Sequence, residues 1–373
     1  MDRLKEIQQD PAYKRCTRCV MDTSDWNIEF DENGVCNHCR DYFTSLDTLD
    51  KRPIEEIWSE IKERATGKYD GILGISGGTD SCWVAYLAKK AGLNLLLVHV
   101  DDGFNTDAAV KNIEATAKHT GFDIEYRIVP QDEMIDVIRA YFKAGVIGLE
   151  SPSDNVYRAI NFKTMEEYDI KNILHGGNYQ TEKILPSTWG YDNKDATNIR
   201  AIHKEFGIMP LKKLSLISFY TYVRKLKFGG IREYRPLYHT DYNRRKAIDT
   251  MVKEWGWIDY GRKHNEARYT KFIECYVFPK RFGFDKRLPH YSTLICSGQM
   301  TRDEAMHLLE TEPLYTDDEL KVEKEFVLGK LGFSEEEFEE LMALPVKSNL
   351  EFKTNKSKQR IYKGLRKALR KFT

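Results

Sequence analysis

Apolar segments of strand length alternate with amphipathic segments along the middle of this 373-residue chain, and this alternation most constrains its fold. The pattern predicts strands at 71–75, 93–100, 123–129 and 170–175, and helices at 79–91, 106–120, 131–144 and 153–168. Strands that alternate with helices of about 10–15 residues form parallel βαβ units. Both faces of such a sheet are covered, which fits the apolar strands among them. The sequence therefore predicts an α/β fold with a doubly wound parallel sheet.

The chain divides into three predicted units. We expect a small zinc-binding module at 1–50, the domain with the sheet at 51–205, and a mainly helical substrate-binding region at 206–373 that ends in a basic stretch. The 58 Lys+Arg balance the 58 Asp+Glu, which argues against the basic footprint of a nucleic-acid binder. We expect no membrane span, because no apolar run reaches 18 residues. The polar first 30 residues do not resemble a signal peptide, so we expect a cytoplasmic location.

Four of the seven cysteines form two Cys-x-x-Cys pairs, Cys16 with Cys19 and Cys36 with Cys39. Pairs separated by about 15–20 residues are typical of zinc sites. Four thiolates complete a tetrahedral set, so the predicted zinc is structural rather than catalytic. Two alternatives stay open, namely two disulfides or a redox-active pair, and His38 could replace one cysteine as a ligand.

The first predicted strand runs directly into the loop Ser76-Gly77-Gly78-Thr79-Asp80-Ser81, and a helix follows. Glycines between a strand and a helix let backbone N–H groups approach an anion, and the helix N-terminus adds partial positive charge. The loop lacks the Gly-Lys-Ser/Thr of a Walker loop and the Gly-x-Gly-x-x-Gly of dinucleotide sites. We expect a phosphate cradle here; the alternative is a plain strand–helix connection.

Polar residues follow two other predicted strands. His99, Val100 and Asp101 end the second strand, and Gly176 and Asn178 follow the fourth. Ligands of open parallel sheets sit at the carboxyl ends of the strands. We therefore expect these residues to bind ATP, with His99 to Asp101 around adenine and ribose. The alternative is that they only terminate strands.

The six-residue loop resembles the signature of the PP-loop ATP pyrophosphatases, which cleave ATP between the α- and β-phosphates. The resemblance implies that Ser76 to Ser81 hold the pyrophosphate end of ATP and that Asp80 helps to bind Mg²⁺. Glu182 matches a Mg²⁺-binding glutamate of related amide-forming ligases. Lys212 and Lys213 match a segment that often precedes a phosphate-binding lysine, although the usual Lys-x-Glu is replaced here by Ser-Leu-Ile.

The zinc module, the loop and a charged, aromatic stretch at 262–298 together resemble the N-acetyl sugar amidotransferase family of bacterial surface-polysaccharide (O-antigen) biosynthesis. The resemblance implies an ATP-dependent ligase that turns the acetamido group of a nucleotide-linked sugar into an acetamidino group. The substrate residues it implies are Arg262, Lys263, His264, Glu266, Arg268, Lys271, Arg281 and Arg287. The alternative is that these charged residues form surface ion pairs.

The resemblance also implies a separate glutaminase and a barrel-shaped partner that supply ammonia. We expect no glutaminase in this chain, because position 2 is not a cysteine and no cysteine nucleophile elbow is visible. One rival function is a tRNA-modifying thiolase of the PP-loop class, which the cysteine directly after Ser81 keeps open. Another is a non-enzymatic zinc-ribbon nucleotide sensor, which would bind ATP without releasing pyrophosphate.

Overall fold

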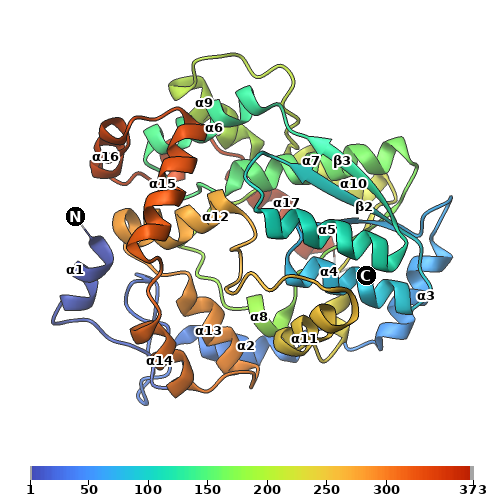
Figure 1. Cartoon of the computed structure of the whole chain (residues 1–373), viewed down its shortest axis with the longest axis horizontal. Coiled ribbons are helices and arrows are strands. Elements are labelled where there is room, and N and C mark those ends of the chain that lie inside the picture. The colour runs from blue at the N-terminus through green and yellow to red at the C-terminus, as the bar shows by residue number, and fades with distance from the viewer. Residues whose placement is uncertain (1, 370–373) are drawn as a thin grey trace.

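The computed structural model describes residues 2–369 and contains one five-stranded sheet (Figure 1). Its strands are β1 (Gly71–Gly74), β2 (Leu95–Asp101), β3 (Asp123–Ile128), β4 (Asn172–Leu174) and β5 (Arg232–Tyr234). The order is β3-β2-β1-β4-β5, and every neighbouring pair is parallel. The predicted doubly wound α/β fold is therefore confirmed.

Successive residues of the strands point to opposite faces of the sheet, and each face has its own apolar core. Leu73 and Leu97, which are paired in register, pack on one face with α3 (Ile54–Glu63), α4 (Thr79–Lys90), α5 (Asp107–Thr120) and α11 (Arg244–Trp255). Their neighbours Ile72 and Leu96 pack on the other face with α7 (Ser151–Glu167) and α10 (Phe219–Phe228). Burial on both faces explains why β1 and β2 are continuous apolar runs, whereas the edge strand β3 is largely exposed.

Further helices lie outside these two layers. In chain order they are α1 (Arg3–Gln9), α2 (Asn37–Leu46), α6 (Gln131–Ala144), α8 (Tyr179–Glu182), α9 (Ala196–Phe206), the short helix η1 (Pro236–His239), α12 (Arg268–Phe272), the π-helix η2 (Ile273–Phe282), α13 (Arg287–Cys296), α14 (Arg302–Thr311), α15 (Asp317–Leu331), α16 (Glu335–Ala343), η3 (Asn349–Glu351) and α17 (Lys356–Leu369). The region after 205 is therefore mainly helical as predicted, but it also supplies β5 to the sheet.

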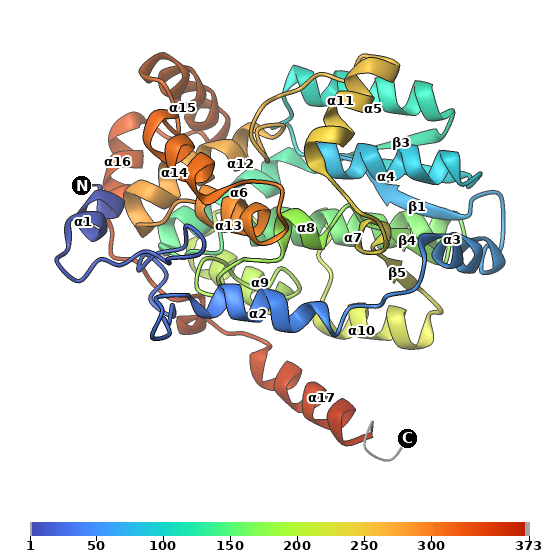
Figure 2. The ribbon, with the colours of Figure 1, turned by 90° about the horizontal axis from the view of Figure 1, so that it is seen from below.

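The cysteine-bearing N-terminal segment lies against the C-terminal helices rather than apart from them (Figure 2). Its cysteines share one apolar core with residues of α6, η2, α13 and α15. Val20 donates its N–H to Ser292 Oγ on α13 at 3.2 Å. Arg302 on α14 donates to the carbonyl oxygens of Cys16 and Cys19, each at 3.2 Å. The first and last parts of the chain thus pack into a common body.

The basic C-terminal stretch forms α17, which projects from the rest of the chain in Figure 2. Its last four residues, 370–373, lie outside the described residues. Among the helices of residues 2–369, none combines the length and the apolar character that crossing a bilayer requires.

Candidate functional site

The Gly-rich loop is a tight turn between β1 and α4. Gly77 has φ +77°, and a Cβ at this position would lie 2.3 Å from the carbonyl oxygen of Ala109. Only glycine fits both constraints. Ser76 Oγ accepts the Gly78 N–H at 3.2 Å, and α4 begins at Thr79 without a side-chain cap. The loop therefore brings backbone amides to the N-terminus of a twelve-residue helix, which is the arrangement of a phosphate cradle.

The segment after β4 packs directly against this loop. A Cβ on Gly176 would lie 3.0 Å from the Ser81 nitrogen and 3.1 Å from Asp80 Cβ, so the backbones approach closely. Asn178 caps α8 by accepting the Thr181 N–H at 2.7 Å, and its own N–H donates to Glu182 Oε2 at 3.1 Å. These contacts bring the carboxylate of Glu182 to the loop that carries Asp80.

Lys263 joins Asp80 and Glu182, the two carboxylates for which the family resemblance implies Mg²⁺ binding. Its Nζ lies 2.7 Å from Asp80 Oδ2 and 2.7 Å from Glu182 Oε1. It also donates to Thr181 Oγ1 at 3.2 Å. Tyr242 donates its hydroxyl to the other oxygen of Asp80. Because one ammonium reaches both carboxylates, one divalent cation can do so too, and carboxylate oxygens are the ligands that Mg²⁺ prefers.

Two more residues from the C-terminal half reach the loop. Tyr260 accepts the Thr79 N–H at 2.9 Å. The carboxyl group of Glu266 lies beside Gly78, where an added Cβ would be 2.7 Å from Oε1. Burial raises the pKa of Glu266, with Asp80 adding to this effect and Lys263 opposing it. The loop is therefore enclosed by residues far from it in the sequence.

A cavity of about 380 Å³ opens beside this group of charges. Lys263 and Thr181 form one part of its wall, so the cavity reaches the Asp80–Lys263–Glu182 cluster. The cationic lining residues are Arg244, Arg245, Arg262, Lys263, Lys286 and Arg287, and the acidic ones are Glu274, Asp285 and Glu312. Leu294, Met300 and Leu308 add an apolar surface. The excess of cations suits an anionic ligand, and Arg262 Nη1 has no partner among the described residues.

His264 lies beside this cavity and His290 lines it. Their ring centroids are 5.4 Å apart, and His264 has a positive φ of 69°. Burial, together with the nearby cations Lys263 and Lys286, holds the pKa of both imidazoles well below the ordinary value. Both rings are therefore neutral near pH 7, which makes them hydrogen-bonding groups rather than charges.

Three of the cations predicted to bind substrate have other contacts and do not line the cavity. Arg268 pairs with Glu323 at 3.1 Å and lies 3.5 Å from the Phe326 ring centroid. Lys271 lies over the ring of Tyr315, and Arg281 is buried and donates to the Phe142 carbonyl oxygen at 3.3 Å. Arg287 does line the cavity, but it is paired with Asp285 at 2.7 Å.

Lys212 and Lys213 lie after α9 with exposed side chains. Their backbone N–H groups donate to the carboxylate of Glu133 on α6 at 2.9 Å. None of the contacts found for these two lysines reaches the loop or the cavity, so their predicted phosphate-binding role has no support from this geometry.

His99 and Asp101 form a hydrogen-bonded network at the ends of β1 and β2. His99 Nδ1 donates to the Ile75 carbonyl oxygen at 3.0 Å. Asn105 Nδ2 lies 3.2 Å from His99 Nε2 and donates to Asp101 Oδ1 at 3.0 Å. Val100 is packed beside this network, partly buried. The network fixes the strand ends next to the loop, whereas the role of these residues toward a nucleotide stays a prediction.

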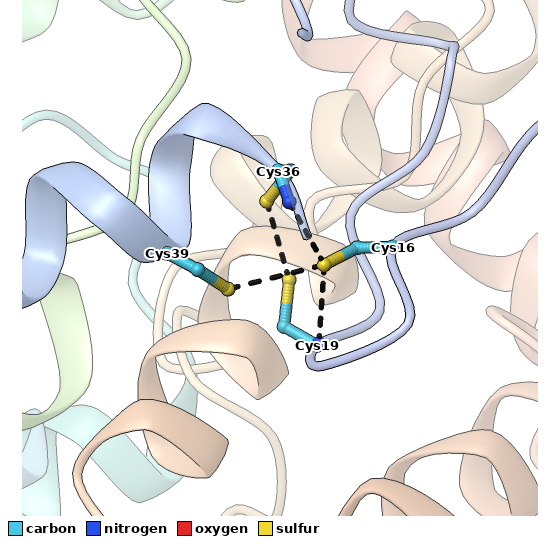
Figure 3. Close-up of side chains that lie close together, drawn as sticks. All are labelled: Cys16, Cys19, Cys36 and Cys39. Carbon is cyan, nitrogen blue, oxygen red and sulfur yellow. Dashed lines mark hydrogen bonds between the residues drawn. The ribbon is translucent and has the colours of Figure 1, made fainter. Parts of the chain in front are cut away.

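The four paired cysteines converge at one buried point (Figure 3). Their sulfur atoms lie within 4.8 Å of one another, with Cys19 and Cys36 at 3.7 Å and Cys16 and Cys39 at 4.0 Å. Four sulfurs around a tetrahedral zinc are separated by about 3.8 Å. These distances fit a metal and exclude disulfides between the four in this structure, where all are free.

The surroundings of the sulfurs support the same conclusion. Cys16 Sγ accepts the N–H groups of Cys19 and Cys36 at 3.4 and 3.2 Å, and such donors stabilise bound thiolates. His38 does not replace a cysteine, since its Nε2 is bonded to Asp25 Oδ2 at 2.7 Å. The cysteine cluster therefore fits a structural metal ion.

Several residues of the site were not singled out from the sequence. Tyr242 and Tyr260 gave no signal, because single tyrosines outside a motif carry none. Lys286 and His290 fall in the charged, aromatic stretch at 262–298, whose density was the available clue. Glu274, in the same stretch, was hidden among apolar residues.

Comparisons with known proteins give one match to a family model and a shorter sequence similarity. Residues 266–366 match the family model described as LPS biosynthesis protein WbpG-like, C-terminal domain. A shorter similarity links the chain to GMP synthase [glutamine-hydrolyzing] of Thermus thermophilus, at 32% identity over 101 residues. That match spans 27% of this chain and only 18% of the synthase.

Similarities to solved structures are weaker. NMN synthetase from Francisella tularensis has a TM-score of 0.35 and 12% identity, covering 79% of this chain and 98% of that one. The U34-tRNA thiolase NcsA from Methanococcus maripaludis, solved with its [4Fe-4S] cluster, has a TM-score of 0.33 and 14% identity, covering 80% and 88%. Likenesses at this level say nothing of reaction or substrate. The match of residues 266–366 to the WbpG-like C-terminal domain of LPS biosynthesis proteins agrees with the family resemblance drawn from the sequence.

Proposed function

We propose that this chain is an ATP-dependent amidotransferase of LPS biosynthesis that acts on a nucleotide-linked N-acetyl sugar. It would adenylate the acetamido oxygen and then replace that oxygen with ammonia, giving an acetamidino group, AMP and pyrophosphate. The observation that carries the proposal is the position of Lys263, which contacts the Asp80 carboxylate of the loop and also lines the cation-rich cavity. The ATP site and the cavity for an anionic substrate are thereby adjacent.

On the ATP side, the amides of the loop would hold the pyrophosphate end of the nucleotide. Asp80 and Glu182 would hold Mg²⁺, because both carboxylates lie within 2.7 Å of a single cationic atom. When bound, Mg²⁺ neutralises charge that develops on the phosphates. Lys263 would then face the same phosphates as a fixed positive charge, which is effective in a site largely closed to water.

On the sugar side, Arg244 and Arg262 would bind the diphosphate that links sugar and nucleoside, since guanidinium groups match phosphate oxygens in pairs. The apolar patch around Leu294 and Met300 would contact less polar parts of the ligand. Binding on both sides of Lys263 would bring the acetamido oxygen to the α-phosphorus. Positioning of this kind supplies much of the rate of a two-substrate reaction.

The chemistry balances in two steps. The acetamido oxygen attacks the α-phosphorus of ATP, and pyrophosphate leaves. Ammonia then attacks the activated carbon, a C–N bond forms, the C–O bond to the adenylate breaks, and AMP departs with the electron pair. Water must be kept out, because it would return the amide by the same route.

We further propose that ammonia comes from a separate glutaminase through a barrel-shaped partner. The basis is the family resemblance drawn from the sequence. The purified chain should then use ammonium and should use glutamine only when those partners are added.

The thiolase alternative is weakened by the environment of the cysteines. Cys82, directly after the loop, is fully buried, and burial raises its pKa to about 11. Cys275 lines the cavity, and burial raises its pKa to about 12. Both are protonated at neutral pH, whereas sulfur transfer needs a thiolate.

The test supplies ATP, Mg²⁺, ammonium chloride and UDP-linked diacetamido sugars to the purified chain. We expect AMP, pyrophosphate and a sugar in which NH has replaced O, detected by mass spectrometry. Asp80→Asn should abolish pyrophosphate release, while Asp303→Asn, an exposed aspartate on α14, should not. ATP binding without pyrophosphate release by the unaltered chain would favour the sensor, and sulfur transfer to tRNA would favour the thiolase.

A further inference from the structure

A buried carboxylate, Glu274, lines the same cavity but has no tight ion pair. It is the second residue of η2, a ten-residue π-helix that contains Pro279. π-helical segments are rare and are frequently found at functional sites. The side chain of Glu274 is 8% exposed, and its nearest cationic atom is Lys286 Nζ at 3.7 Å. That lysine is closer to Glu150, at 3.3 Å.

Burial brings the pKa of Glu274 close to neutral pH, although the largest charge effect on it, that of Lys286, lowers it. Burial raises the pKa of Glu274 to about 8, and Glu150 and Glu266 add to the effect while Lys286 opposes it. Further ionisable groups that line the same cavity include Lys263, Arg262, Cys275, Asp285, Arg287 and His290. A carboxyl group with a pKa near the working pH is suited to exchange protons.

We propose that Glu274 is the base that removes the proton from ammonia as it attacks the adenylated acetamido carbon. This role rests on the proposed function. The C–N bond forms, the C–O bond to AMP breaks, and the proton released by the new C–N nitrogen passes to the Glu274 carboxylate. Lys286 stabilises that carboxylate before the transfer.

Other groups near the cavity are less suited to this role. Asp80 and Glu182 are held by Lys263 at 2.7 Å, and Asp285 is held by Arg287 at 2.7 Å. The imidazoles of His264 and His290 are weak bases, because burial and the neighbouring cations keep their pKa well below 6.5. Glu274 is therefore the carboxylate lining the cavity that is buried and only loosely paired with a cation.

The test separates the two half-reactions in Glu274→Gln. Sugar-dependent exchange of pyrophosphate into ATP reports adenylation, and amidino-sugar formation reports the ammonia step. We expect exchange within about threefold of the unaltered chain, and amidino-sugar formation from ammonia lower by about 10²–10⁴-fold. Hydroxylamine, a less basic nucleophile that needs less help in losing its proton, should recover part of the rate. Glu336→Gln, an exposed residue of α16, is the matched control.

Glu274→Asp keeps the carboxylate, so it changes the chemistry of the site less than Glu274→Gln does. We expect it to retain part of the ammonia step, with a shifted pH profile. An unchanged rate and pH profile with ammonia in Glu274→Gln would overturn the assignment, and so would an unshifted profile in Glu274→Asp if the glutamine variant fails to fold. Absence of exchange in the unaltered chain would instead overturn the proposed function itself.

Discussion

Lys263 Nζ lies 2.7 Å from Asp80 Oδ2, although the two residues are 183 positions apart in the sequence. Their side chains are only 13% and 16% exposed. The ion pair connects the Gly-rich loop at the carboxyl edge of the sheet with the region that lines the cavity. Occupation of the cavity and binding at the loop are therefore expected to depend on each other.

Replacing Lys263 with methionine should strongly slow adenylation in a chain that still folds. The ammonium contacts two carboxylates, and methionine leaves both without their shared cation. We expect pyrophosphate exchange to fall by about 10²–10³-fold, the range typical for loss of one group that stabilises a transition-state charge. Lys246→Met on the exposed face of α11 is the control, and equal exchange rates in the two variants would contradict the assignment.

Breaking this pair should also lower stability. Removing one partner of a buried ion pair lowers the free energy of unfolding by up to about 3–5 kcal/mol. We expect a smaller loss here, because Glu182, the second carboxylate that Lys263 contacts, is 31% exposed. Denaturant unfolding of Lys263→Met and Lys246→Met measures the difference directly. We expect added Mg²⁺ to reduce it, because a bound cation would replace the missing ammonium between the carboxylates.

Replacing Gly77 with alanine should disable the loop. The residue has φ +77°, and the new Cβ would lie 2.3 Å from the Ala109 carbonyl oxygen, so α5 or the loop must move. We expect a loss of about 1–3 kcal/mol in the free energy of unfolding, and loss of ATP binding measured by calorimetry. Gly67→Ala is the matched control, since nothing lies within 4 Å of its added Cβ. Equal ATP affinity in both variants would count against the cradle.

The strands of the sheet illustrate what the sequence can and cannot predict. The first two strands were predicted because each is an apolar run of the kind that burial on both faces requires. The third and fourth were predicted from the alternation of strands with helices, and the third, Asp123–Ile128, is a largely exposed edge strand. The fifth, Arg232–Tyr234, was missed, since it is a three-residue edge strand with an exposed arginine and carries no apolar run. It nevertheless pairs with β4 in the register Leu174↔Tyr234.

For the site too, the sequence predicts only what a local pattern encodes. The loop was predicted because its glycines and serines are contiguous, and the cysteine cluster because its spacing is regular. The bridge from Lys263 to Asp80 depends on how the C-terminal half folds back onto the sheet, which local pattern does not encode. Arg268 shows the opposite case: its charge suggested a substrate contact, but the fold pairs it with Glu323 and Phe326.

The cysteine cluster should bind about one zinc ion per chain, with little iron, when measured by elemental analysis. Cys36→Ser should lose most of this metal and unfold at a lower temperature, because metal binding to four thiolates contributes free energy to the fold. The cluster also contacts α13 and α14 through Val20 and Arg302. Loss of the metal should therefore also disturb these helices, which line the cavity. Cys275→Ser, outside the cluster, should keep its metal. Unaltered melting of metal-free protein would contradict a structural role.

The raised pKa of Glu274 predicts how stability varies with pH. Between the ordinary value of 4.5 and about 8, the unfolded chain has released this proton while the folded chain keeps it. The free energy of unfolding should therefore be highest below pH 4.5 with respect to this group and fall as pH rises toward 8, by at most about 1.4 kcal/mol per pH unit. Glu274→Gln cannot release a proton and should lack this contribution.

The difference in unfolding free energy between the unaltered chain and Glu274→Gln isolates this group from the other acids, which titrate in both proteins. That difference should shift steadily in favour of the glutamine variant from pH 5 to about 8 and then level off. Glu336→Gln should show no such trend, because this side chain is exposed on α16. A difference that is flat across this range would mean that Glu274 is ionised in the folded chain at neutral pH. Lys286 would then hold it as a simple ion pair, unable to take up a proton near neutrality.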